Sequence, residues 1–222
     1  MRRRIARHHL PLALATAAAL GLVYALTPSP NPVFRWSMAT AYVGLALLGA
    51  TLFTGPLNVI RRRPNPVSTD LRRDVGIWAG AVSIAHFLIG WQVHMKHRWL
   101  YWLAEVEGSD RLVPRSDLFG FANDTGLLAV IVAALLLVLS NDYYLRQLGT
   151  RRCKRAQRWN YVLFALVVVH GIAFQAIEKR KIAFVVTLAA MTAATAAAQY
   201  AGWTQIRRRA ADTSTDRLTT DA

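Results

Sequence analysis

The sequence predicts an all-α integral membrane protein, a six-transmembrane-helix bundle with both termini in the cytoplasm. Apolar residues make up 54% of the 222 residues and gather in six blocks, each about as long as the ~20 residues that a helix needs to cross the hydrocarbon core. Arginine clusters separate the blocks, and most of the 27 lysines and arginines fall on the side that would hold the termini. This is the positive-inside pattern, and the even number of blocks agrees with it.

Each block predicts one membrane helix, and the blocks are 10–27, 37–55, 75–95, 122–141, 159–177 and 182–203. The first block follows three arginines, as in a signal peptide. We expect a helix that is kept, because the block is long for a signal peptide and Pro28–Ser29–Pro30 is not a small-x-small cleavage site. The membrane domain is then 10–203. It lies between a basic cytoplasmic amino terminus, 1–9, and a cytoplasmic tail, 204–222, that we expect to be disordered.

The predicted loops differ on the two sides of the membrane. Segments 56–74 and 142–158 are basic and are predicted to be cytoplasmic, and three prolines break any helix in the first of them: Pro56, Pro64 and Pro66. The longest external segment, 96–121, starts with aromatic residues that suit a short interfacial helix, with a partner-binding surface as the alternative. The connection from Glu178 to Lys181 is so short that the last two helices are expected to be antiparallel neighbours.

The net charge of +15 would indicate nucleic-acid binding in a soluble protein. Here the charge follows the membrane topology and suits contact with anionic lipid. We therefore expect membrane lipid and no nucleic acid as a partner, in a multi-pass protein of the bacterial inner (plasma) membrane. The single cysteine, Cys153, has no partner for an internal disulfide and is interpreted as an ordinary reduced thiol in a cytoplasmic loop.

Two histidines, His86 and His170, are the ionisable side chains that fall well inside the apolar blocks. Each follows the start of its own block by the same interval, His86 after Val75 and His170 after Trp159, which places both about 16 Å from the inner boundary of the membrane. The two helices run in the same direction, so the rings meet at one depth. Such a pair is a candidate for the two axial ligands of one haem iron, and two filled axial positions favour electron transfer.

Other interpretations of the histidines stay open. A membrane histidine is often a hydrogen-bonding residue between helices. Zinc is disfavoured, because no further cysteine or carboxylate lies at that depth to complete four ligands. His94 and His97 lie near the outer end of the third helix, where they are either solvated or take part in a redox or substrate-binding role.

The segments that lead to the two histidines are LRRDVGIWAG on the third helix and CKRAQRWNYVLFALVVVH on the fifth. With six helices, they resemble the ferric reductase-like transmembrane domain family, and within it the MsrQ-type haem-binding subunit of the periplasmic methionine sulfoxide reductase system, over about residues 40–200. The resemblance implies b-type haem ligation by His86 and His170, with electrons from the quinone pool or a flavin reductase passed to a periplasmic molybdopterin enzyme. A second histidine that the family commonly has on the fifth helix is replaced here by Gln157, and the corresponding position on the third helix is Arg73. We therefore expect one haem.

The sequence thus predicts a cytochrome b-like protein that carries electrons from a quinol or flavoprotein donor to a periplasmic redox partner or ferric iron. With no flavin domain of its own, we expect the electron-transfer subunit of an oxidoreductase. FMN or a quinone is a further candidate cofactor. Arg73 and Arg158 are candidates to bind a haem propionate or a flavin phosphate, with lipid as the default ligand. The rivals are a haem-free membrane scaffold or small transporter, and a haem-based sensor or assembly factor.

Overall fold

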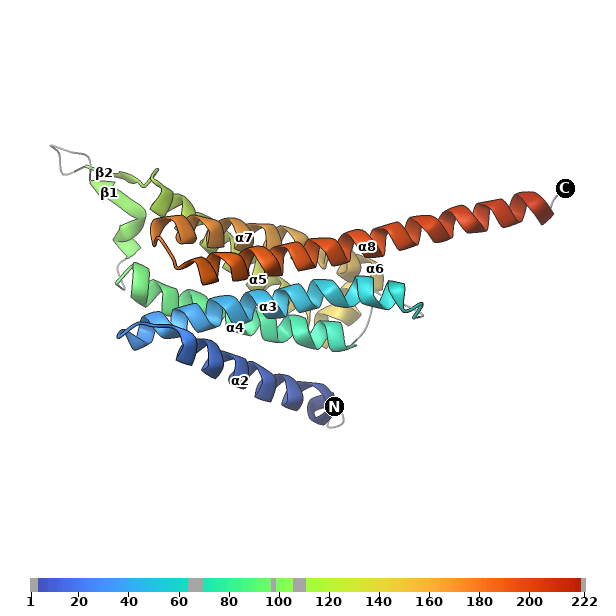
Figure 1. Cartoon of the computed structure of the whole chain (residues 1–222), viewed down its shortest axis with the longest axis horizontal. Coiled ribbons are helices and arrows are strands. Elements are labelled where there is room, and N and C mark those ends of the chain that lie inside the picture. Colours follow the sequence, from blue (N-terminus) through green and yellow to red (C-terminus); the bar gives the residue numbers. More distant parts are fainter. Residues whose placement is uncertain (1–3, 64–69, 97–98, 106–110, 221–222) are drawn as a thin grey trace.

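The computed structural model describes residues 4–220 except 64–69, 97–98 and 106–110. Within that part of the chain, six helices are long and apolar enough to cross a membrane. They lie side by side as one elongated bundle (Figure 1), which confirms the predicted all-α six-helix membrane fold. Pro64, Pro66 and His97 lie outside the described residues.

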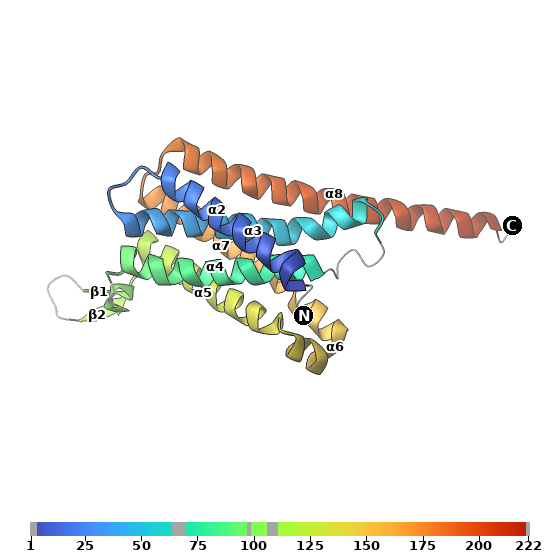
Figure 2. The same cartoon turned by 90° about the horizontal axis from the view of Figure 1, so that it is seen from below.

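The elements follow one another in a simple up-and-down order. The helices are η1 (Ile5–His9), α2 (Leu10–Leu26), α3 (Pro32–Ile60), α4 (Asp70–His94), η2 (Trp99–Trp102), α5 (Leu118–Leu139), α6 (Asp142–Ala156), α7 (Trp159–Ile177) and α8 (Ile182–Thr220), and the strands are β1 (Leu103–Glu105) and β2 (Leu112–Pro114). The two strands form an antiparallel hairpin in which Ala104 lies opposite Val113. We call the end of the bundle that carries this hairpin the hairpin end, and the end that carries α6 the basic end. Figure 2 shows both ends.

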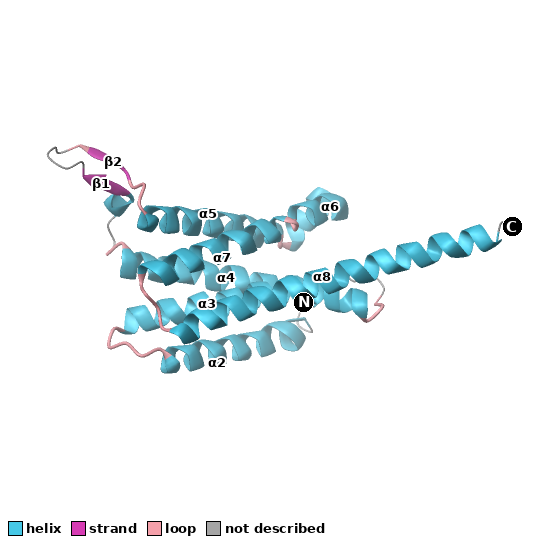
Figure 3. Cartoon of the chain, turned by 45° about the horizontal axis from the view of Figure 1, so that its top comes forward, coloured by secondary structure: helices cyan, strands magenta, loops and turns pink. Residues whose placement is uncertain are grey.

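The helices differ in how much of their surface the bundle covers. In the apolar part of α3, 61% of the residues are buried, against 6% in the first span, which contains α2. Helix α3 packs against α4 and α8, and α5 packs against α7. Helices α2 and α5 lie at opposite edges of the bundle (Figure 3). The most exposed faces are apolar, as expected where lipid rather than water surrounds the helices.

Side-chain caps explain where three of the helices begin. The Asn31 side chain accepts hydrogen bonds from the backbone N–H groups of Val33 and Phe34, at 2.9 and 3.3 Å, and starts α3. Asp117 accepts from the N–H of Gly120 at 2.8 Å and starts α5. Asn141 starts α6 in the same way. Each cap satisfies backbone donors that have no partner inside the helix.

The expectation that Pro56 breaks the helix is wrong, because α3 continues through it to Ile60. A proline inside a helix removes one backbone N–H, so the carbonyl four residues earlier loses its partner. That carbonyl belongs to Leu52, and it accepts a hydrogen bond of 2.6 Å from the Gln199 side chain of α8. Gly202 of α8 also lets the proline ring approach closely, since a Cβ there would lie 2.8 Å from the Pro56 Cβ.

Two connections and the carboxy-terminal tail also differ from the prediction. Most of the predicted loop 142–158 is helix α6, which is kinked at Gly149, where φ is 69°. The aromatic stretch of 96–121 forms only the short helix η2 before the hairpin. The tail expected to be disordered continues α8 as helix to Thr220. No proline or glycine follows Gly202, and alanine and arginine, which favour helix, lie along the start of the tail.

Candidate functional site

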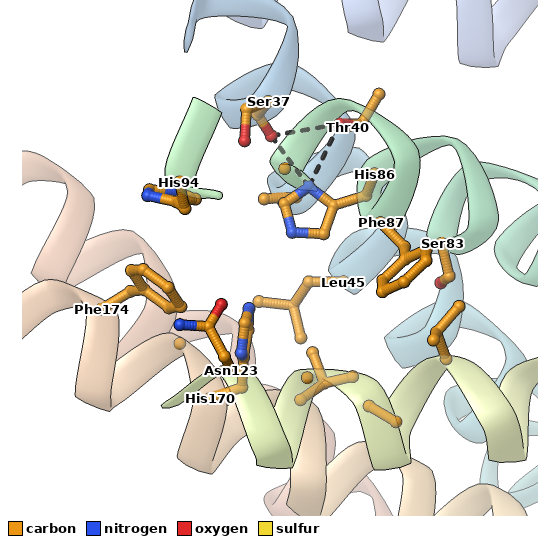
Figure 4. A pocket seen from close by; sticks show the side chains of 18 of the residues that line it. Ser37, Thr40, Leu45, Ser83, His86, Phe87, His94, Asn123, His170 and Phe174 are labelled. Carbon is orange, nitrogen blue, oxygen red and sulfur yellow. Dashed lines mark hydrogen bonds between the residues drawn. The ribbon is translucent and has the colours of Figure 1, made fainter. Parts of the chain in front are cut away.

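The bundle brings together the two histidines that the sequence singles out. The ring of His86, on α4, and the ring of His170, on α7, lie with their centroids 6.2 Å apart and their planes at 81°. The two rings face one cavity from opposite sides (Figure 4). His86 is eight residues before the last residue of α4, and His170 seven before the last residue of α7. Both therefore lie about 10–12 Å from the hairpin end, nearer to it than to the basic end.

Each ring is oriented by a helix other than its own. The Nδ1 atom of His170 lies 2.8 Å from the carbonyl oxygen of Ala122, on α5. The Nδ1 atom of His86 lies 3.1 Å from the carbonyl oxygen of Ser37 and 3.2 Å from the Thr40 hydroxyl, both on α3. A carbonyl oxygen only accepts, so Nδ1 carries the proton in both rings. The lone pair is then on Nε2, which is how protein environments prepare histidines to bind metals.

The cavity between the rings has a volume of about 160 Å³. Its wall toward the basic end is apolar and includes Leu48, Ala129, Val130, Leu163 and Val167. Its wall toward the hairpin end contains polar and aromatic groups, among them His94, Trp102, Gln175 and Arg180. The cavity is therefore a mostly hydrophobic slot with one polar end, the combination of apolar walls and a few polar groups that ligand sites share.

Gly126 on α5 makes room for the His170 ring. A Cβ atom at this position would lie 2.7 Å from both Cε1 and Nδ1 of the imidazole, a distance that real Cβ atoms essentially never show. The ring thus packs directly on the backbone of α5, beside the Ala122 carbonyl to which it donates. The sequence analysis missed Gly126, because nothing in the sequence shows which helix lies against His170.

The spacing of the two rings fits one iron atom between them. Each bond from a metal to an imidazole nitrogen is about 2 Å, and each ring centre lies about 1 Å beyond its nitrogen. Two ligands on opposite sides of one iron therefore have ring centroids about 6 Å apart, close to the observed 6.2 Å. No group of three or more His, Cys, Asp or Glu side chains in the described residues is placed to hold a metal ion. A porphyrin supplies four nitrogens itself and needs only two axial ligands.

The other predicted site residues lie elsewhere. Arg73 lines a separate cavity at the basic end, together with Arg4 and His9. Arg158 is the residue before α7, and Gln157 lies beside it at the end of α6. Neither arginine is among the residues that line the cavity between the histidines, so their predicted cofactor-binding role stays a prediction.

His94 lies at the polar end of the cavity. Its ring centroid is 4.5 Å from that of Phe174, and its Nδ1 atom lies 3.7 Å from a carboxylate oxygen of Glu178. The nearby Arg180, in the turn between α7 and α8, also lines the cavity and escaped the sequence analysis. Its position in a short connection gave no sign that the turn folds over a cavity.

Comparison with known proteins gives no match to a family model, to a curated protein or to a solved structure. The resemblance to the ferric reductase-like transmembrane domain therefore stays a prediction.

Proposed function

We propose that this chain is a membrane-bound b-type haem protein that carries electrons across the bilayer, with His86 and His170 as the axial ligands of one haem. The observation that carries the proposal is the pair of imidazoles that line one cavity with their centroids 6.2 Å apart, and whose Nδ1 atoms donate to carbonyl oxygens, so that the lone pair is on Nε2. Ionisable groups at this depth are expensive to place and usually mark a functional site.

The chain's residues would hold the cofactor and keep water from it. When bound, haem supplies an iron that changes between the ferric and ferrous states and so takes up and releases one electron at a time. His86 and His170 would hold the haem iron between their rings, which lie 6.2 Å apart, an arrangement that favours electron transfer. The carbonyls of Ser37 and Ala122 accept hydrogen bonds from the two rings and would keep both imidazoles oriented toward the iron.

The placement of the site supports a direction for electron flow. The hairpin end lies nearer to the histidines, and we propose that the acceptor, a periplasmic redox partner or ferric iron, docks there. A quinol or flavoprotein donor would approach the basic end from the cytoplasm of a bacterial cell. We propose that the chain acts as the electron-transfer subunit of an oxidoreductase, with the catalytic step left to a partner protein.

One observation favours a second candidate function. The same hydrogen bonds that would orient two haem ligands also join α4 to α3 and α7 to α5. In a haem-free scaffold or small transporter, the two histidines would serve only to join neighbouring helices by these hydrogen bonds.

The colour of the purified protein separates the two functions. The full-length chain is purified in detergent from cells supplied with a haem precursor, and oxidised and dithionite-reduced spectra are recorded beside those of His86→Ala and His170→Ala. His9→Gln, at the basic end and outside the cavity, is the matched control. A six-coordinate b-type spectrum near one haem per chain, kept in the control and lost in both test variants, is the expected result. A colourless wild-type protein would contradict the haem proposal and favour the haem-free scaffold or transporter.

A further inference from the structure

The cavity between the histidines has one charged side chain among its described lining residues apart from histidine, and this is Arg180. Its guanidinium donates to the thioether sulfur of Met38 and lies 5.2 Å above the ring of Phe34. A thioether is a weak acceptor. Burial lowers the pKa of this guanidinium, although the nearby Glu178 raises it in part. Arg180 is thus a half-buried cation with donors to spare, facing a slot for an apolar cofactor.

A second unused donor lies at the same end of the cavity. The indole Nε1 of Trp102 is buried and has no hydrogen-bond partner among the described residues. Its ring packs edge-on against Trp91, with centroids 5.6 Å apart. A buried N–H without a partner is unfavourable, so a donor of this kind calls for an explanation such as a group that binds there.

The opposite end of the cavity offers nothing of this kind. Toward the basic end its walls are aliphatic, and the one hydroxyl group there, that of Ser83, already donates to the carbonyl of Ala79 at 2.8 Å. A haem has the same asymmetry: one edge carries two propionate carboxylates, and the opposite edge is apolar. Because both histidines lie at nearly one depth, a haem held between them would lie along the bundle, and its propionate edge could then face the polar end of the cavity.

We infer that Arg180, helped by the indole N–H of Trp102, binds the haem propionates, so that the propionate edge faces the hairpin end. The inference rests on the proposed function. Arg180 thereby takes the role that the sequence suggested for Arg73 and Arg158, neither of which lines the cavity. It also puts the more polar edge of the cofactor toward the side where we place the acceptor.

The test compares variants that change one cation in the same turn. Arg180→Gln removes the charge, Arg180→Lys keeps it, and Lys179→Gln removes an exposed charge from the neighbouring residue as the matched control. Loss of haem to excess apomyoglobin and the midpoint potential between pH 5 and 8 are measured on each purified protein. Neither measurement needs a partner or an enzymatic assay.

The expected results follow from losing a charge-assisted hydrogen bond. Arg180→Gln loses haem about tenfold to a hundredfold faster than the wild type. Its midpoint potential at pH 8 falls, because an unpaired carboxylate stabilises the ferric iron. The pH-dependent part of the potential moves to higher pH, because a propionate without its cation has a raised pKa. Arg180→Lys and Lys179→Gln follow the wild type in pH profile.

Trp102→Phe is a second, independent variant that removes only the N–H donor. We expect a several-fold faster haem loss in the same assay. Wild-type behaviour of both Arg180→Gln and Trp102→Phe would overturn the inference. Changes in Arg73→Gln or Arg158→Gln instead would place the propionates toward the basic end. A wild type without haem would overturn the proposed function itself, which the spectra reveal before any variant is made.

Discussion

Gly126→Ala is the sharpest test of the geometry around the histidines. The new methyl group would lie 2.7 Å from two atoms of the His170 ring, whereas ordinary contacts begin at 3.4 Å. The ring must therefore retreat by about 0.7 Å, or α5 must move away from α7. Positions of metal ligands tolerate about 0.2 Å, so a shift of this size breaks or badly strains the bond to the iron.

The free energies separate an effect on the site from an effect on the fold. Overpacking costs about 1–3 kcal/mol, and alanine gains about 1 kcal/mol over glycine in a helix. Unfolding of the apoprotein should thus change by about 2 kcal/mol at most. Haem binding should suffer far more, because the His170 ring also leaves the Ala122 carbonyl that holds it at 2.8 Å.

The assay is the haem content and the spectrum of the purified variant. We expect well under half of the wild-type haem, with the six-coordinate low-spin spectrum replaced by a five-coordinate one. Gly21→Ala is the control, because a Cβ at Gly21 has nothing within 4 Å. Full haem content with an unchanged spectrum in Gly126→Ala would refute the placement of His170 against α5.

The remaining predictions concern the frame around the site. Gln199→Ala leaves the carbonyl freed by Pro56 without a partner and should lower the free energy of unfolding by about 1–3 kcal/mol; in a Pro56→Ala background, which restores the backbone donor, thermal unfolding should show a smaller loss. Asp74, fully buried and bonded to Arg4, anchors the amino-terminal helix to α4, so Asp74→Asn should speed hydrogen exchange in η1 while the core stays protected. Asp117→Ala removes the cap of α5 and should cost about 1 kcal/mol. Since hydrogen bonds from Arg115 lower the pKa of the Asp117 carboxyl, the contribution of this cap should persist from neutral pH to below about pH 4 and be lost only under stronger acid.

The sequence predicts those parts of the structure that depend on local composition. Apolar block length reveals six helices, and the equal spacing of His86 and His170 from their arginine-rich ends places both rings at one depth. What the sequence leaves out depends on which helices become neighbours. Pro56 stays helical only because Gln199, far along the chain, reaches its orphaned carbonyl. Gly126 makes room for the His170 ring only because α5 packs against α7, and no local sequence pattern in either helix predicts that contact.

The proposed site depends on four helices, because the helices that carry the two histidines differ from those that orient them. The iron-binding rings come from α4 and α7, but their orientation is set by backbone carbonyls of α3 and α5. These four helices must therefore keep their relative positions to within a few tenths of an ångström for both ligands to bind one iron. Helix α2 supplies none of the lining residues, and little of its own surface is buried against the bundle. Changes that loosen α2 should thus leave the haem spectrum intact, whereas changes that shift α3 or α5 should alter it without touching a ligand.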